Sequence, residues 1–251
     1  MTTLALILST LVALALTVLL AQLPGPKAQR RRDRPQRLLT DATLLYAVAL
    51  FFPLWDYGLI DTLGLPLVRL WTPRPDITVG AAVLLVLPWF IAALRRGHVG
   101  LMGWQLPVRG GLAGLVILVT ALLGALPLVQ GTPVAPASGW TFALSFFTVA
   151  LLDESLFRGA IQSRLEVVMA EAWPWLITGL LFGLWYAPAI LADATATGAT
   201  MTDMLLRLLF QLSLGWLLSV TRSVTGSLLP GLLAHFLFLQ IGPLLALLLG
   251  R

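Results

Sequence analysis

Long apolar runs, each about as long as a bilayer-crossing helix, follow one another along this chain and constrain its fold most strongly. The first run covers residues 3–23 and contains no charged residue. A bilayer core takes about 20 residues of helix, and helices satisfy their backbone polar groups internally there. The chain is 59% hydrophobic and 11% charged, whereas soluble domains are about one quarter charged. The sequence therefore predicts an all-α membrane protein.

The hydropathy pattern predicts a polytopic bundle of about eight transmembrane helices. A signal peptide is the competing interpretation of the first run. However, basic residues follow this run, whereas in a signal peptide they precede the apolar segment. We therefore expect an uncleaved first helix. The expected spans are residues 3–23, 42–58, 77–94, 110–128, 139–164, 173–191, 203–220 and 227–249.

Basic residues lie in the short segments between these runs, and this pattern predicts the orientation. Cytoplasmic loops carry the excess of Lys and Arg. The segment 24–41 holds six of the 16 basic residues, six later ones fall on the same side, and four fall on the other. We expect a multi-pass plasma-membrane protein with a basic cytoplasmic loop at 24–41 and both termini outside. The net charge of +5 reflects this topology, so we do not expect nucleic-acid binding.

Two adjacent carboxylates, Asp153 and Glu154, interrupt the fifth run at a depth of about 20 Å in the bilayer. An ionisable side chain there costs about 2.5–3.5 kcal/mol on insertion scales. Glu154 and Arg158 are four residues apart, so they share a helix face and can pair. Asp153 points about 100° away from Glu154 and keeps its charge available. A buried ion pair that only fixes helix packing is one interpretation, and a hydrolytic or proton-handling site is the other.

Two later runs offer polar groups at a comparable depth. Phe182 and Tyr186 are four residues apart in the sixth run and therefore share a face, and Pro188 frees a backbone carbonyl nearby. His235 lies within the eighth run, whereas His98 falls in a short predicted loop. A lone histidine in an apolar helix is often a packed residue, but intramembrane carboxylates favour a functional role.

On these residues the chain resembles the CPBP family of intramembrane peptidases. This family comprises CAAX proteases and bacteriocin-processing enzymes and is also called the Abi family. Its pattern is Glu-Glu-x-x-x-Arg, then Phe-x-x-x-His, then His-x-x-x-Asn or Asp. The resemblance implies a catalytic core of helices over residues 110–251, preceded by N-terminal helices over residues 1–109. The matching stretches are Asp153 to Arg158, Phe182 to Tyr186 and His235 to Leu239.

The resemblance implies an intramembrane endopeptidase with its active site toward the cytoplasmic half of the membrane. Asp153, together with Glu154, would activate a water for attack on a peptide carbonyl. Arg158 would hold Glu154 ionised and oriented. Tyr186 and His235 would stabilise the oxyanion or relay a proton.

Three positions depart from the family pattern. Asp153 stands where the family has its first Glu, Tyr186 stands where it has His, and Leu239 stands where it has Asn or Asp. Leucine cannot donate a hydrogen bond, and one lost oxyanion donor costs about 10²–10³ in rate. A catalytically impaired pseudoprotease that binds or scaffolds another membrane protein is therefore the alternative hypothesis.

The residue types argue against a conventional zinc site. The chain has no cysteine and two histidines, and it lacks the helical His spacings of zinc peptidases. We therefore expect a metal-free, carboxylate-activated water and no cofactor. A proton-coupled transporter is a third hypothesis, which no inverted repeat supports. The expected partners are the lipid bilayer and a peptide or membrane-protein substrate. The sequence leaves open the substrate's identity and the oligomeric state.

Overall fold

Every regular element in the described part of the protein is a helix, as the sequence predicts. The computed structural model describes residues 3–25, 35–56, 102–131, 139–170 and 172–249. Single helices are α1 (Thr3–Ala21), α2 (Pro35–Asp56), α4 (Gly110–Val129), α7 (Trp173–Trp185), α8 (Ala187–Thr197), α9 (Met201–Thr225) and α10 (Leu229–Leu248). One further continuous helical segment consists of α5 (Gly139–Leu144), η3 (Ser145–Leu151), η4 (Glu154–Gln162) and α6 (Ser163–Val168).

Five helical segments in the described residues are long and apolar enough to cross a membrane. Four of them are α1, α4, α9 and α10, and the fifth consists of α7 and α8 taken together. The expected count of about eight is therefore not confirmed. The predicted span over residues 77–94 and the loop histidine, His98, lie outside the described residues.

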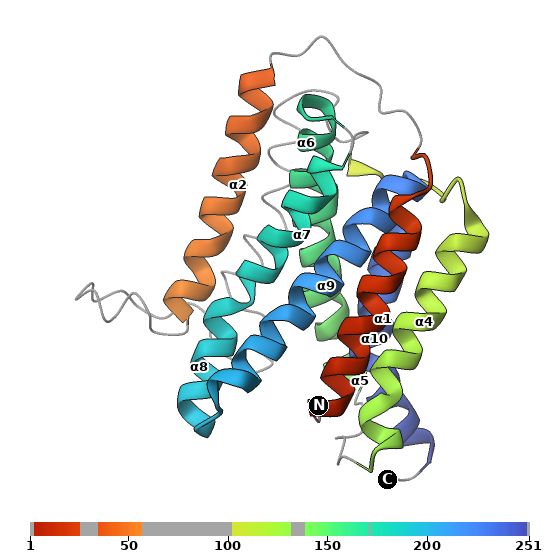
Figure 1. The fold of residues 1–251 in the computed structure, drawn as a ribbon, viewed down its shortest axis with the longest axis vertical. Coiled ribbons are helices and arrows are strands. Elements are labelled where there is room, and N and C mark those ends of the chain that lie inside the picture. The colour runs from red at the N-terminus through yellow and green to blue at the C-terminus, as the bar shows by residue number, and fades with distance from the viewer. Residues whose placement is uncertain (1–2, 26–34, 57–101, 132–138, 171, 250–251) are drawn as a thin grey trace.

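Helix α9 lies at the centre of the bundle (Figure 1). It packs against α7 on one side and α1 on the other, while α10 packs against α4. Helix α2 covers η4 and α6 from the far side. Helix α1 begins at the end of the bundle where helix α10 ends (Figure 1). This arrangement encloses η4, which carries the acidic motif, between α2, α7 and α9.

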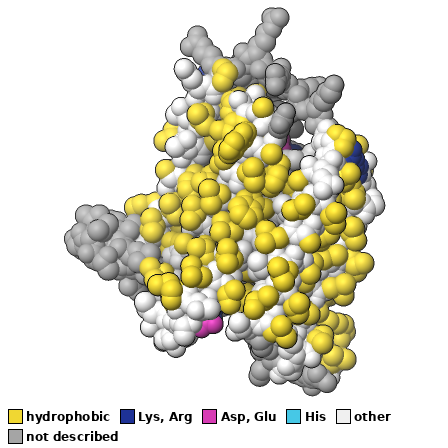
Figure 2. Space-filling model, viewed as in Figure 1, with side chains coloured by type: hydrophobic (Ala, Val, Ile, Leu, Met, Phe, Trp, Pro, Cys, Tyr) yellow, Lys and Arg dark blue, Asp and Glu magenta, His cyan; other side chains and the backbone are white. Residues whose placement is uncertain are grey.

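The outer surface of the bundle is apolar, which suits contact with lipid. Figure 2 shows hydrophobic side chains over most of the visible face. On α4, for example, Leu118 and Leu122 are about 60% exposed. In water such a large contiguous apolar surface would be an aggregation or interaction site. Together with the five candidate spans, it identifies a multi-pass integral membrane protein.

Helices α7 and α9 cross closely because glycines line their contact. A Cβ atom on Gly179 would lie 2.8 Å from the backbone nitrogen of Trp216, and one on Gly215 would lie 2.6 Å from the carbonyl oxygen of Gly179. The indole of Trp216 donates a hydrogen bond to the carbonyl oxygen of Leu176, at 3.0 Å. Small residues allow this backbone approach in membrane helix pairs. The crossing brings the backbone of α9 within reach of η4.

Helix α2 begins earlier than the sequence prediction placed it. Its first residue is Pro35, so the last residues of the predicted 24–41 loop belong to the helix. Leu38, Leu45 and Ala49 are buried on one face of α2, which packs on α6 and η4. Burial of this stripe extends the helix beyond the purely apolar run, because packing can outweigh the local polarity of the sequence.

The connection between α8 and α9 is shorter than the predicted outer loop. Helix α8 continues to Thr197 and is capped by Gly198, whose φ of +66° suits a residue without a Cβ atom. Thr200 and Asp203 then form a reciprocal capping box at the start of α9. These two caps end one helix and begin the next within three residues.

Candidate active site

The segment that carries Asp153 and Glu154 is π-helical on both sides of these residues, in η3 and η4. All nine residues of η4 are buried. A π-helix is rare and is frequently found at functional sites. The apolar periodicity that predicts a helix here does not distinguish a π-helix from an α-helix, so the sequence analysis did not predict this widening.

Glu154 and Arg158 form the ion pair that their four-residue spacing predicts. The Nη1 atom of Arg158 donates to Oε1 of Glu154 at 3.1 Å, and both side chains are fully buried. The Nη2 atom of Arg158 donates to the carbonyl oxygen of Gly215 on α9, at 3.0 Å. A buried charge needs such partners, because an unpaired one is very costly. The guanidinium therefore holds Glu154 and ties η4 to α9.

Helix α10 places His235 and Gly231 against the other side of Glu154. The Nδ1 atom of His235 lies 3.3 Å from Oε1 of Glu154, without the alignment of a hydrogen bond. A Cβ atom on Gly231 would lie 2.7 Å from Oε2 of Glu154. Glycine at this position thus leaves the space that the carboxylate occupies. Glu154 therefore lies between the guanidinium of Arg158 and the imidazole of His235.

Asp153 has a different partner from Glu154. The hydroxyl group of Tyr186 donates to Oδ2 of Asp153 at 2.6 Å. Asp153 is buried and Tyr186 is half-buried. Tyr186 lies at the break between α7 and α8, where its carbonyl oxygen accepts a hydrogen bond from the amide of Ile190. The two adjacent carboxylates therefore face separate helices and bind chemically different groups.

Phe182 connects these groups, although it was not among the predicted site residues. The Cζ atom of Arg158 lies 4.2 Å from the centre of the Phe182 ring. The same ring lies 5.8 Å from the imidazole of His235 and 5.2 Å from the ring of Tyr186, centre to centre. A cation over a desolvated aromatic ring gains about 2 kcal/mol. The sequence contained this signal in the four-residue spacing of Phe182 and Tyr186.

The structure brings all five predicted site residues together from three helical segments. Asp153, Glu154 and Arg158 come from the fifth predicted span, Tyr186 from the sixth and His235 from the eighth. Leu239, one turn beyond His235, is half-buried and has no polar group. Among the described residues, no group of three or more His, Cys, Asp and Glu could hold a metal ion. The five site residues supply two carboxylates, a phenol, an imidazole and a guanidinium.

A comparison with protein families matches residues 135–239 to the type II CAAX prenyl endopeptidase Rce1-like family. This segment is similar to that family. The match confirms the resemblance to CAAX proteases and contains all five site residues. It begins just before α5 and ends within α10. The searches of curated proteins and of solved structures found no match. The matched residues are less than half of the chain, so the comparison shows what this segment is similar to.

Proposed function

We propose that this protein is an intramembrane endopeptidase that hydrolyses a peptide bond with a carboxylate-activated water. The observation that carries the proposal is the pair of buried adjacent carboxylates within the Rce1-like segment. Asp153 is bound by a hydrogen-bond donor, and Glu154 lies between a guanidinium and an imidazole. Placing two carboxylates in different environments is how enzymes give them different roles.

Asp153 is the proposed general base. Tyr186 occupies its Oδ2 atom, which leaves Oδ1 to accept a proton from water. The water oxygen forms a bond with the peptide carbonyl carbon, and the carbonyl oxygen becomes the oxyanion. The carbon–nitrogen bond then breaks as the proton passes to the leaving amine. The products are a carboxylic acid and an amine, so the reaction needs no cofactor.

Glu154, Arg158 and His235 have supporting roles in this mechanism. Arg158 fixes the Glu154 carboxylate, which stands beside the base and orients the water. His235 and the phenol of Tyr186 are the available donors to an oxyanion. Surrounding helices exclude bulk water, and this strengthens each electrostatic contact.

The pseudoprotease is the second candidate, and two observations favour it. The hydroxyl of Tyr186 is engaged with Asp153 in the resting structure, so it serves the oxyanion only if that contact changes. Leu239 offers no donor. A scaffold function predicts a membrane partner that co-purifies with the protein, and this partner stays bound when Asp153→Ala is introduced.

A cleavage assay on the purified protein in liposomes tests the peptidase function. We expect the wild type to cleave members of a fluorogenic peptide library. Asp153→Asn and Glu154→Gln should each reduce kcat by at least about 10²-fold, because proton transfer by a positioned side chain contributes about 10²–10⁴. Asp193→Asn is the matched control, since Asp193 forms a surface ion pair with Arg207. Equal turnover by all four proteins would refute the assignment.

The proposal also includes an orientation. The end of the bundle where α1 and α9 end, drawn uppermost in Figure 1, is the cytoplasmic end. Arg222 lies in the last turn of α9, and Arg164 lies in α6; both helices reach this end. Excess basic charge on the cytoplasmic side supports this orientation. Residues 110–251 form the proposed catalytic core, because they supply all five site residues.

A further inference from the structure

Three polar residues at four-residue intervals on η4 and α6 face three residues at the same interval on α9. Each facing pair is separated by 57 residues and joined by a hydrogen bond. The constant separation means that the two helices run parallel in a fixed register. We call this set the polar ladder. Its pairs are Arg158 with Gly215, Gln162 with Ser219, and Glu166 with Ser223.

Gln162 is the central member of the polar ladder. It is fully buried, and its Nε2 group faces three acceptors at 2.9 Å: the carbonyl oxygen of Ser219, the hydroxyl of Ser223 and Oε1 of Glu166. The hydroxyl of Ser223 also donates to Oε1 of Glu166, at 3.1 Å. Gln162, Glu166 and Ser223 thus bind one another as well as their facing helix.

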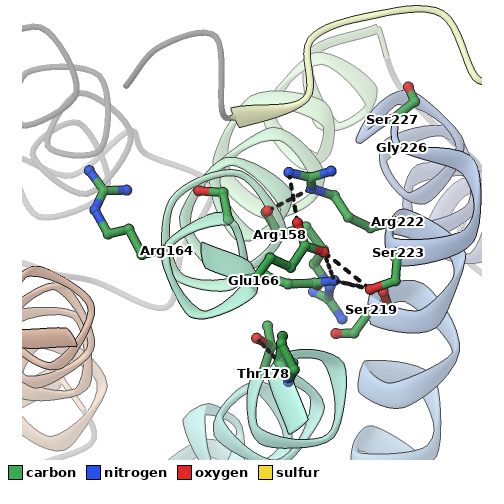
Figure 3. A network of polar contacts seen from close by, with 12 residues as sticks. Arg158, Arg164, Glu166, Thr178, Ser219, Arg222, Ser223, Gly226 and Ser227 are labelled. Carbon is green, nitrogen blue, oxygen red and sulfur yellow. Dashed lines mark hydrogen bonds and ion pairs between the residues drawn. The ribbon is translucent and has the colours of Figure 1, made fainter. Parts of the chain in front are cut away.

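Arg222 connects the end of the ladder back to its beginning (Figure 3). Its Nη2 atom lies 3.6 Å from Oε2 of Glu166, and its Nε atom donates to the carbonyl oxygen of Arg158 at 2.9 Å. Gly103 packs against this guanidinium, since a Cβ atom there would lie 2.9 Å from it. Helix α9 therefore binds both the main chain and the side chain of Arg158.

We propose that Gln162, Glu166 and Ser223 are positioning residues for the active site. They keep η4 in register with α9, so that Arg158 stays on the carbonyl of Gly215 and holds the Glu154 carboxylate beside His235. A slip of one residue would break all three pairs at once, so the ladder opposes sliding of the widened helix. This inference rests on the proposed peptidase function, which it deepens.

A purely structural role is the competing explanation, and two readouts separate it from positioning. The groups that face Glu154 are Asp153, Arg158 and, from α10, His235; Tyr186 of α7 binds Asp153. Loss of stability lowers the amount of folded enzyme, whereas displacement of Arg158 lowers kcat of the folded enzyme and leaves KM nearly unchanged. We therefore compare kcat with KM at equal concentrations of folded protein, and we test rescue by a variant that restores the hydroxyl group.

Two neighbouring serines on α9 provide a matched pair of variants. Ser223 joins the ladder through its hydroxyl. Among the described residues, Ser219 joins it only through its carbonyl oxygen, and its buried hydroxyl has no hydrogen-bond partner there. Ser223→Ala therefore removes ladder contacts, whereas Ser219→Ala retains them. Ser223→Thr restores a hydroxyl group at the position.

The experiment measures kcat and KM for these variants in liposomes, at equal concentrations of folded protein. We expect Ser223→Ala to lower kcat by about tenfold, which is the usual size of a lost buried hydrogen bond, with KM changed by less than about twofold. Ser219→Ala and Ser223→Thr should match the wild type. An unchanged kcat in Ser223→Ala, or an equal loss in Ser219→Ala, would overturn the proposal.

Hydrogen–deuterium exchange of residues 154–162 provides a readout that does not depend on peptidase activity. Ser223→Ala should speed exchange there by about tenfold, while Ser219→Ala leaves it within about twofold. If the wild type cleaves no peptide, the proposed peptidase function fails, and the exchange comparison still decides whether the ladder holds η4. Equal exchange in both serine variants would refute the ladder's role in either case.

Discussion

The hydroxyl of Tyr186 determines how Asp153 presents its carboxylate. Aspartate has one methylene fewer than glutamate, so its oxygens remain close to the helix backbone. The phenol reaches this short side chain across the helix contact and binds Oδ2 at 2.6 Å. A hydrogen bond to a charged group contributes about 1.5–3 kcal/mol. Tyr186 is therefore a partner of Asp153, the proposed base, in the resting structure as well as a proposed donor to an oxyanion.

Tyr186→Phe tests this contact with the smallest change. Removing the hydroxyl should lower kcat/KM by about 10–10²-fold, because Asp153 loses a charge-assisted hydrogen bond. Tyr46→Phe is the matched control, since the buried hydroxyl of Tyr46 has no hydrogen-bond partner in the part of the chain that the structure describes. Both proteins are assayed with the same cleaved peptide in liposomes. Wild-type kcat/KM in Tyr186→Phe would exclude a role for the phenol.

The close crossing of α7 and α9 is the element on which the position of Arg158 depends. Gly215 permits the crossing because it has no side chain, and its carbonyl oxygen accepts a hydrogen bond from Arg158. Gly179 lies opposite it on α7. Stability and site geometry therefore depend on the same few atoms of α9.

Gly215→Ala should separate the two helices. The added Cβ atom would lie 2.6 Å from the carbonyl oxygen of Gly179 and 2.9 Å from Cδ1 of Phe182. Overpacking of this kind costs about 1–3 kcal/mol, which we expect as a lower thermal midpoint in detergent. Gly114→Ala is the control, because nothing lies within 4 Å of its Cβ position. A midpoint for Gly215→Ala that equals that of the control would contradict the close crossing.

Local spacing was sufficient to predict contacts within one helix but not contacts between helices. The four-residue spacing of Glu154 and Arg158 predicts their ion pair, and the pair is present. The same spacing continues to Gln162 and Glu166, so the polar stripe was visible in the sequence. Its partner Gly215 was not predictable, because a backbone carbonyl has no sequence signature and its position depends on the helix crossing.

At the scale of the whole molecule, hydropathy predicted helices but not their exact ends or number. Apolar runs predict α1, α4, α9 and α10 closely. The early start of α2 accompanies burial of Leu38 in a helix that packs on α6, which no local pattern encodes. The sixth predicted span is divided at Tyr186, and Pro188 lies in the first turn of α8, where a residue without an amide hydrogen is tolerated. Contacts between helices therefore influence helix ends that the hydropathy pattern does not predict.

The proposed orientation can be tested directly because the chain has no cysteine. Gln22 and Ala196 are exposed at opposite ends of the bundle. We expect a membrane-impermeant maleimide to label Ala196→Cys in intact cells and Gln22→Cys only after permeabilisation. The basic segment after α1 gives the reason, since positive charge is retained in the cytoplasm. The reverse labelling pattern would show that the topology is opposite to the proposed one.

The constant separation along the polar ladder limits where the length of the chain can change during evolution. Insertions or deletions in the turn at residues 198–200 would alter the separation equally for all three pairs and leave their alignment intact. One extra residue between Gly215 and Ser223 would instead rotate part of α9 by about 100°, leaving some pairs matched and the others misplaced. Relatives that retain the ladder should therefore vary in length within turns and not within η4 or α9.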